Sequence, residues 1–459
     1  MDWRPDITGG EGFIHQRIVR ALEADIAVGA LTPDTRLPTH RDLAHRLGVG
    51  VGAVTQAYAQ AEARGLIASR VGRGSFVAGP QSRGSPEAIQ PGIIDLARNT
   101  APSLAAATHL ATTLTALRRR NDLAVHLGYP PPAGMESHRR AGAAWLGATV
   151  EWPDVDADRI ICTGGAQQAI AVAMAAACRP GDAVIVEEAT FSGLKTLADH
   201  MGYLLKPVAM DRHGILPDAM DRMADATSAR VAYLQPLQNP TGRIMDLERR
   251  HAILAVARRR GMMIVEDDLY GAYAADLALP PLAVLAPDRV FYVSGLSKSL
   301  TPGLRVGYLV PPLGGDRFAR CLTALRAVAF GPPGLAGLIA AQWIEDGTAH
   351  TVLGAHKTEF AARSDLARGI LAGAEAPRNQ TATHLWVPMS ELAAERAAAR
   401  ALTRGVEVTP AAAPQIAGSD THGLRVCLGA APNRAVLVQG LTALARAMID
   451  GADDGLGMV

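Results

Sequence analysis

One lysine of this chain stands among side chains that are suited to amine chemistry. The chain has 45 Lys and Arg residues, and only four of them are lysines: Lys195, Lys206, Lys298 and Lys357. A Schiff base needs a lysine, because arginine stays protonated at any working pH. Lys298 follows the apolar run VFYVSGL in a loop of small residues, and Arg305 comes seven residues later. The other three lysines lack such partners, so we expect them on the solvated surface.

Three more polar side chains follow apolar, strand-like runs, where α/β proteins place their ligands. Asn239 lies in the turn QNPTG, and Asp267 ends the run MIVED with Tyr270 three residues later. Together with Lys298 and Arg305, these residue types meet the needs of pyridoxal 5′-phosphate. That cofactor requires a lysine for the imine, an acid at the ring nitrogen, donors to the phenolic oxygen, and cations or N–H groups at the phosphate.

A glycine turn before a helix adds a candidate phosphate site. Residues 160–163 are predicted to form a strand, and GGAQQAIAVAMAAA is predicted to be the turn and helix that follow. The backbone N–H groups at the start of such a helix suit an anion. Glycine turns of this kind are common, so the turn alone is weak evidence.

The elements that must position these residues form an α/β pattern. RIICTGG, DAVIVEE, ARVAYLQP, MMIVEDD and VFYVSGL are apolar runs separated by helical patterns, which predicts an α/β domain with a largely parallel sheet. GPQSRGSPEAIQPG is rich in proline and glycine and has no apolar periodicity, which indicates a linker. We therefore expect a first domain over residues 1–79, a linker over 80–92 and a large domain over 93–459.

The first domain shows the pattern of helices followed by a hairpin. Apolar residues recur at four-residue spacing from Ile14 to Ile26, Thr39 is a predicted N-cap, and LIASRVGRGSFVAG predicts two short strands around a glycine turn. This order is typical of a winged helix-turn-helix. Residues 64–83 hold four arginines and no acid, so the wing can approach a phosphate backbone or a minor groove.

Two family resemblances rest on these motifs. LPTHRDLAHRLGVGVGAVTQAYAQAEARGLIASRVGRGSFVAG resembles the DNA-binding domain of the GntR family of bacterial regulators, over about residues 12–79. Residues from about 93 to 450 resemble the aspartate-aminotransferase-like, fold-type-I pyridoxal 5′-phosphate enzymes, whose N-P-T-G, D-x-x-Y and S-K-x6-R elements occur here in the family's order. A winged helix joined to such a domain resembles the MocR subfamily of bacterial regulators.

The aminotransferase resemblance implies a role for each polar candidate. Lys298 would carry the cofactor as an internal aldimine, and Asp267 would pair with the pyridine nitrogen. Asn239 and Tyr270 would donate to the phenolic oxygen. The residues implied to hold the phosphate are Gly165, Ala166, Gln167, Ser297 and Arg305.

Three further residues match the family, and two positions depart from it. Phe191 would stack on the ring, Tyr129 would reach the phosphate of the neighbouring subunit, and Arg425 would bind a substrate carboxylate, although a structural ion pair is the alternative for Arg425. The usual serine-x-serine-lysine is Gly295–Lys298 here, and Ala166 stands where serine is common. Both departures remove hydroxyls from the phosphate site and predict somewhat weaker phosphate binding.

The GntR resemblance implies contacts to double-stranded DNA. The implied DNA-binding residues are Arg41, Thr55, Gln56, Tyr58, Arg70, Arg73 and Gly74. The chain departs from the family at Gly50–Ala53, which offers no side-chain hydrogen bonds to base edges. A degenerate domain that only mediates dimer contacts is the alternative.

Composition excludes several other classes. The net charge is 45 − 44 = +1, and no apolar stretch approaches the roughly 18 residues of a membrane span. The four cysteines are scattered and the 13 histidines lack metal spacing, so we expect reduced, buried thiols and no metal site. The N-terminus lacks a secretory pattern, so we expect a cytoplasmic protein.

Together the resemblances imply a regulator that binds operator DNA and carries pyridoxal 5′-phosphate. It would sense an amino-group effector, such as an amino acid, or the cofactor itself, and would form a head-to-tail homodimer. The alternative is an active class I/II aminotransferase with a vestigial winged helix, which the retained Arg425 and the complete lysine site allow.

Overall fold

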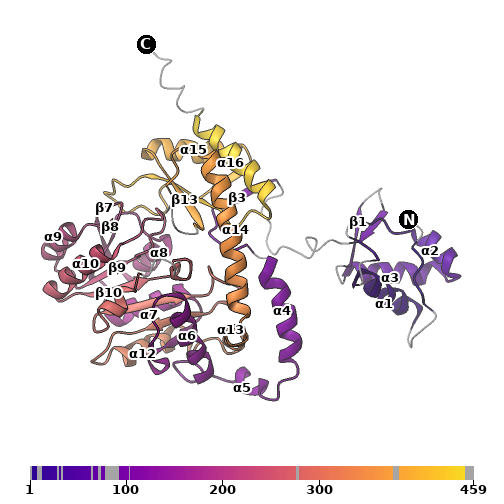
Figure 1. Ribbon diagram of the computed structural model, residues 1–459, viewed down its shortest axis with the longest axis horizontal. Helices are drawn as coiled ribbons and strands as arrows, with labels where there is room; N and C mark the ends of the chain where they lie inside the picture. Colours follow the sequence, from indigo (N-terminus) through magenta and orange to yellow (C-terminus); the bar gives the residue numbers. More distant parts are fainter. Residues whose placement is uncertain are drawn as a thin grey trace, which may run out of the picture. The chain divides into compact units, whose positions relative to one another are not determined.

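The chain divides into two compact units, Met1–Pro91 and Gly92–Val459. The computed structural model describes residues 3–7, 13–27, 30–32, 35–63, 66–70, 74–77, 92–102, 104–274, 279–375 and 382–449. The predicted linker over 80–92 lies outside these residues except for Gly92. Figure 1 shows the helices and strands of each unit.

The first unit holds three helices and an antiparallel strand pair. They are α1 (Ile14–Ala27), α2 (His40–Leu47), α3 (Val51–Ala63), β1 (Ile67–Arg70) and β2 (Gly74–Val77). Thr39 caps α2 as predicted, because its hydroxyl accepts from the N–H of Asp42 at 3.2 Å. Gly48 ends α2 with a φ of 65°, which favours glycine. The stripe of α1 supplies Ile18 and Leu22 to a core shared with α2 and α3.

The second unit is built on a seven-stranded sheet, which confirms the predicted α/β class. Its order is β4 (Ile161–Thr163), β12 (Gly307–Val310), β11 (Val290–Gly295), β10 (Met263–Asp267), β9 (Val231–Leu234), β5 (Ala183–Glu187) and β6 (Leu204–Val208). Among these seven strands, β12 alone runs against the direction of the others. The functional turns follow the carboxyl ends of β4, β9, β10 and β11.

Two apolar layers cover the sheet because successive residues of each strand face opposite sides. In β5, Val184 and Val186 join one core cluster, whereas Ile185 joins the other. The helices around the sheet are α6 (Glu136–Thr149), α7 (Ala166–Ala177), α8 (Ser192–Met201), α9 (Pro217–Thr227), α10 (Leu247–Arg260), α11 (Leu282–Leu285), α12 (Arg317–Ala329) and α13 (Gly334–Glu345). A small antiparallel pair, β7 (Met210–Asp211) and β8 (Gly214–Ile215), precedes α9.

The remaining elements build a second part of this unit. They are β3 (Ile94–Leu96), α4 (Leu104–Leu117), α5 (Leu123–Leu127), α14 (Thr348–Ile370), β13 (His384–Pro388), α15 (Glu391–Thr403), β14 (Val406–Val408), β15 (Gly423–Cys427) and α16 (Arg434–Ile449). The long helix α14 runs from α13 to the side of α15 and α16 (Figure 1). β3 pairs in parallel with β14, and β13 pairs antiparallel with β15.

Three expectations from the sequence concern the cysteines, membrane spans and metal sites. All four cysteines are free and buried, as predicted. Within the described ranges, no helix is long and apolar enough to cross a membrane, and no group of three or more His, Cys, Asp or Glu residues could hold a metal ion.

Candidate functional site

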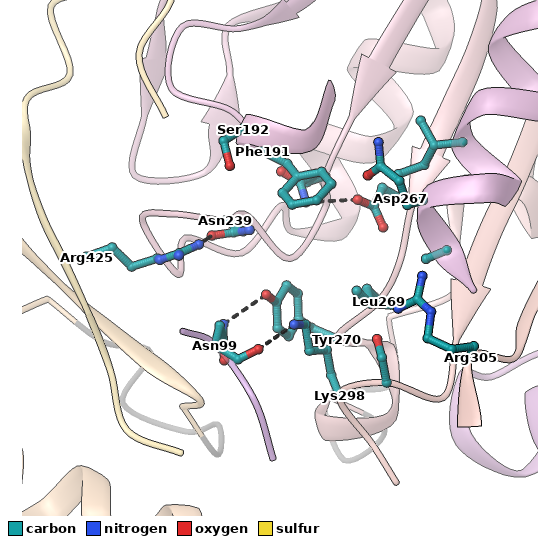
Figure 2. Close-up of a pocket in the computed structure, with 15 residues that line it drawn as sticks. Asn99, Phe191, Ser192, Asn239, Asp267, Leu269, Tyr270, Lys298, Arg305 and Arg425 are labelled. Carbon is teal, nitrogen blue, oxygen red and sulfur yellow. Dashed lines mark hydrogen bonds between the residues drawn. The ribbon is translucent and has the colours of Figure 1, made fainter. Parts of the chain in front are cut away.

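A cavity of about 200 Å³ lies at the carboxyl ends of the central strands. It brings together ten of the predicted residues: Ala166, Gln167, Phe191, Asn239, Asp267, Tyr270, Ser297, Lys298, Arg305 and Arg425. Its other lining residues are Asn99, Ile170, Ser192, Gln235 and Leu269. Figure 2 shows Arg425 entering from one side of the cavity and Arg305 from the other, with Lys298 and Tyr270 between them.

Lys298 occupies a largely buried place after β11. Its Nζ donates to the backbone carbonyl of Asn99, and its own carbonyl accepts from the Tyr273 hydroxyl at 2.7 Å. Burial lowers the pKa of Lys298 to about 8, because desolvation disfavours the charged form. The neutral amine is therefore accessible near physiological pH, which a nucleophilic lysine requires.

Asp267 ends β10, and among the described residues only one of its two carboxylate oxygens accepts a hydrogen bond. Its Oδ2 accepts from the Tyr233 hydroxyl at 2.5 Å and from Gln235 Nε2 at 3.2 Å. Its Oδ1 is buried and has no hydrogen-bond partner among the described residues. Burial raises the pKa of Asp267 to about 6, against the lowering effect of the Tyr233 hydrogen bond. A buried carboxylate oxygen without a hydrogen bond destabilises the folded protein, so a ligand that donates to this atom would be bound favourably.

Arg425 and Asn99 fix which polar groups face the cavity. Arg425 Nη1 donates to Asn239 Oδ1 at 2.9 Å. Since this arginine has only donors, the Asn239 amide must turn its NH₂ group the other way. Asn99 Nδ2 likewise donates to the Tyr270 hydroxyl at 2.9 Å, which leaves the phenolic proton available to a ligand oxygen. Burial raises the pKa of Tyr270 well above its usual range, so the hydroxyl keeps that proton.

The turn between β4 and α7 forms a candidate anion site. Gly165 precedes α7 with a φ of 98°, and Ala166 and Gln167 begin the helix, whose first N–H groups have no intrahelical acceptor. Arg305, itself at a φ of 51°, donates from Nη2 to the carbonyl of Gly164 at 3.3 Å. Gly307 permits the approach of the two segments, because a Cβ there would lie 2.6 Å from the Gly165 carbonyl carbon.

These observations fit pyridoxal 5′-phosphate. The unpaired Asp267 Oδ1 matches a protonated ring nitrogen, and the free donors of Asn239 and Tyr270 match a phenolic oxygen. The start of α7 together with Arg305 matches a phosphate. Lys298 lies in the same cavity.

Sequence reasoning missed several residues of the site. Gln235 follows β9 as Asp267 ends β10, so the rule that polar residues mark strand ends could have found it. Tyr233 reaches Asp267 from inside β9, and Asn99 reaches Tyr270 from 171 residues away. Neither of these two contacts leaves a local sequence signal.

Two residues singled out in the sequence lie outside the cavity lining. Tyr129 is 86% exposed and packs its ring against Phe330, and its contact with the phosphate of a neighbouring subunit stays a prediction. Lys195, expected on the solvated surface, donates from Nζ to the carbonyls of Ala412 and Ala413 at 3.1 and 3.0 Å. Lys195 stays partly exposed, and it makes these bonds because the loop after β14 approaches the start of α8.

The predicted DNA-binding residues divide into three groups. Arg41, Thr55, Gln56 and Gly74 are exposed on the first unit. Tyr58 is instead 3% exposed, and its hydroxyl donates to the Pro38 carbonyl at 2.9 Å, so its prediction as a DNA contact was wrong. Its ring fills the core between α2 and α3. The side chain of Arg70 and the whole of Arg73 lie outside the described residues.

Comparison with known proteins identifies the family. Residues 91–444 match the aminotransferase class I and II family, and residues 14–77 match the bacterial regulatory proteins of the gntR family. The chain belongs to the aminotransferase class I and II family. With a gntR-type helix-turn-helix domain in front, it has the architecture of the MocR subfamily of regulators.

Relatives and solved structures share this arrangement or part of it. The chain is 28% identical to the HTH-type transcriptional regulator YdeF of Bacillus subtilis (strain 168), over 98% of this chain and 97% of that protein. It is 28% identical to the probable rhizopine catabolism regulatory protein MocR of Rhizobium meliloti, over 68% of each chain. The large unit of this chain has the same fold as the α-aminoadipate aminotransferase LysN of Thermus thermophilus. The TM-score is 0.70 at 24% identity, and the match covers 79% of this chain and 93% of LysN.

Proposed function

We propose that this protein is a transcription regulator that binds DNA through its first unit and holds pyridoxal 5′-phosphate on Lys298. The observation that carries the proposal is the coexistence of both parts on one chain. The cavity gathers Lys298, the unpaired oxygen of Asp267 and the anion site of Arg305. The first unit exposes Arg41 and Gln56 on the helices of a helix-turn-helix.

Each residue has a defined task towards the cofactor. Pyridoxal 5′-phosphate supplies an aldehyde that reacts with primary amines, which is the chemistry of an amino-group sensor. Lys298 would hold it, and its lowered pKa keeps a share of the amine neutral. Asp267 would hold a proton at the ring nitrogen, while the amide of Asn239 and the hydroxyl of Tyr270 would donate to the phenolic oxygen. Phe191 lines the same cavity and would stack on the ring.

We further propose that the effector carries an amino group and a carboxylate. Arg425 lines the cavity and is held by Thr409 Oγ1 at 3.0 Å and the Ala97 carbonyl at 3.1 Å, both to Nη2. A guanidinium fixed in this way suits a carboxylate. An effector can regulate DNA binding only when it has different affinities for two states of the protein.

The assembly we propose is a head-to-tail homodimer. The exposed ring pair of Tyr129 and Phe330 supports this proposal, since both side chains are aromatic and more than half exposed. Aromatic residues are enriched at protein interfaces. Analytical ultracentrifugation of the wild type and of Phe330→Asp tests it, with a dimer expected for the former and a monomer for the latter.

The absorbance spectrum of the purified protein tests the proposed site. Addition of pyridoxal 5′-phosphate to the wild type is expected to give a bound visible absorption band, and Lys298→Ala should abolish it. Lys357→Ala is the matched control, because Lys357 lies on α14 outside the cavity lining. A wild type that stays colourless, or a Lys298→Ala variant with the wild-type band, would contradict the proposal.

The second candidate function is an active aminotransferase. The complete set of Lys298, Asp267 and Arg425 in one cavity favours it. An assay of amino acids with 2-oxoglutarate separates the two functions. Sustained turnover at enzyme-like rates without DNA binding would establish the aminotransferase, whereas DNA binding with negligible turnover would establish the regulator.

A further inference from the structure

The chain that enters the second unit leads straight into the candidate site. Gly92 is the first residue of that unit, and the N–H of Ile94 donates to the carbonyl of Gly405 at 2.7 Å. β3 then pairs with β14, and Leu96 is fully buried. Asn99 lies seven residues after Gly92, a span of at most about 25 Å when fully extended. A change at Asn99 is therefore close, along the chain, to the segment that leads from the first unit.

The residues after β3 are held in a fixed turn. Asp95 is buried, and its Oδ1 accepts from the N–H groups of Ala97 and Arg98 at 2.8 and 2.9 Å. The carbonyl of Ala97 accepts from Arg425 Nη2 at 3.1 Å and from Thr409 Oγ1 at 3.0 Å. This short segment therefore touches the proposed effector arginine directly.

Asn99 connects the same segment to the lysine of the site. Its carbonyl accepts from Lys298 Nζ, and its Nδ2 lies 2.9 Å from the Tyr270 hydroxyl (Figure 2). The same Nδ2 lies 3.0 Å from His384 Nδ1. Burial lowers the pKa of His384 to about 3, so the ring is neutral and its Nδ1 can accept from the amide. The contacts of the Asn99 side chain thus fix the position of the Asn99 backbone carbonyl, which accepts from Lys298.

Asn99 also carries an incomplete set of hydrogen bonds. The residue is 9% exposed, and its Oδ1 is buried without a partner among the described residues. A buried acceptor without a donor destabilises the arrangement it belongs to. The hydrogen bond from Lys298 therefore contributes a larger share of the stability of this segment than it would in a turn whose polar groups were all paired.

We propose that Asn99 is a positioning residue that couples the state of Lys298 to the chain leading to the DNA-binding unit. The inference rests on the proposed function, since it assumes that a ligand engages the Lys298 nitrogen. A free Lys298 donates to the Asn99 carbonyl and holds residues 97–99. A ligand on that nitrogen withdraws the donor, and the segment and β3 become easier to open.

Hydrogen exchange of the full chain tests this coupling, with pyridoxal 5′-phosphate as the probe and its absorbance as the measure of loading. In the wild type, loading should speed exchange of the amides of residues 93–99 by about tenfold, the factor expected for one lost hydrogen bond to a charged donor. In Asn99→Ala the exchange should already be fast and should not respond. Asn99→Leu keeps the volume of the side chain, removes the amide, and should behave in the same way.

Thr100→Ala is the matched control, because the Thr100 hydroxyl bonds to the Ala101 carbonyl at 3.4 Å and Thr100 is not part of the cavity lining. It should respond to loading as the wild type does. Unchanged exchange in a loaded wild type would overturn the inference, as would a wild-type response in Asn99→Leu. A wild type that fails to load would instead refute the proposed function, and the inference with it.

Discussion

Removing the Tyr233 hydroxyl should shift the pH dependence of cofactor binding. Tyr233→Phe deletes the group that donates to Asp267 Oδ2 at 2.5 Å and leaves the ring in its fully buried place. A hydrogen bond to a charged acceptor stabilises the charged form by about 1.5–3 kcal/mol. A difference of about 1.4 kcal/mol shifts a pKa by one unit. The pKa of Asp267, raised by burial to about 6 in the wild type, should therefore rise to about 7–8.

The sign of the effect follows from the charge that the cofactor needs. Only the ionised carboxylate supports a protonated ring nitrogen, so affinity for pyridoxal 5′-phosphate is present above the pKa of Asp267 and is lost as pH falls through it. At pH 7 the variant should bind about twofold to tenfold more weakly than the wild type, from the change in ionised fraction alone. At pH 9 the two proteins should bind alike.

Spectrophotometric titration with the cofactor between pH 5.5 and 9 measures this shift. Tyr292→Phe is the matched control, because Tyr292 is equally buried and donates at 2.8 Å to Asp268, the neighbouring carboxylate outside the cavity lining. Its pH profile should follow the wild type. Weaker binding of Tyr233→Phe by the same factor at every pH would refute the reasoning, because it would mean that the hydroxyl supports packing and not ionisation.

Three further pairs of substitutions test other parts of the structure. Gly307→Ala places a Cβ 2.6 Å from the Gly165 carbonyl carbon and should weaken cofactor binding measurably, whereas Gly303→Ala, with its nearest contact at 3.8 Å, should bind like the wild type. Arg363→Met removes the donor to the carbonyls of Leu428 and Ala431 and should lower the free energy of unfolding, measured by urea titration, by about 3 kcal/mol. The exposed Arg434→Met should have a much smaller effect. Tyr58→Phe should lower the thermal midpoint of the first unit, because the lost hydrogen bond destabilises the folded unit by about 1 kcal/mol. Gln56→Ala should weaken DNA binding and leave that midpoint unchanged. The reverse pattern would contradict the core position of Tyr58.

Much of this molecule follows from local patterns in its sequence. Thr39 and Gly48 mark the ends of α2 by capping chemistry, and the strand runs that end in Asp267 and before Lys298 predict both the sheet and the edge where the cavity lies. These signals are local, because strand periodicity and caps depend on neighbours in the sequence. The sequence predicts the strands of the first unit at residues 66–69 and 75–78, and each is shifted by one residue in the structure, because hairpin ends carry the weakest signal.

The rest depends on contacts between distant segments. Asn99 meets Lys298 199 residues away, and Lys195 meets the carbonyl of Ala413 218 residues away. Tyr58 shares the apolar spacing of Val54, Ala57 and Ala61, but only the fold shows that its hydroxyl donates to the Pro38 carbonyl. Sequence spacing cannot supply such pairings, because they arise when separate elements are packed together.

The central claim is that DNA binding depends on the state of the lysine site. Fluorescence anisotropy of the full chain on a duplex from the gene's own upstream region, with and without pyridoxal 5′-phosphate, measures this most directly. The cofactor should change the dissociation constant by about fivefold or more in the wild type, within the usual range of allosteric coupling, and should leave it unchanged in Lys298→Ala. Identical affinities with and without the cofactor in the wild type would show that DNA binding does not depend on the lysine site.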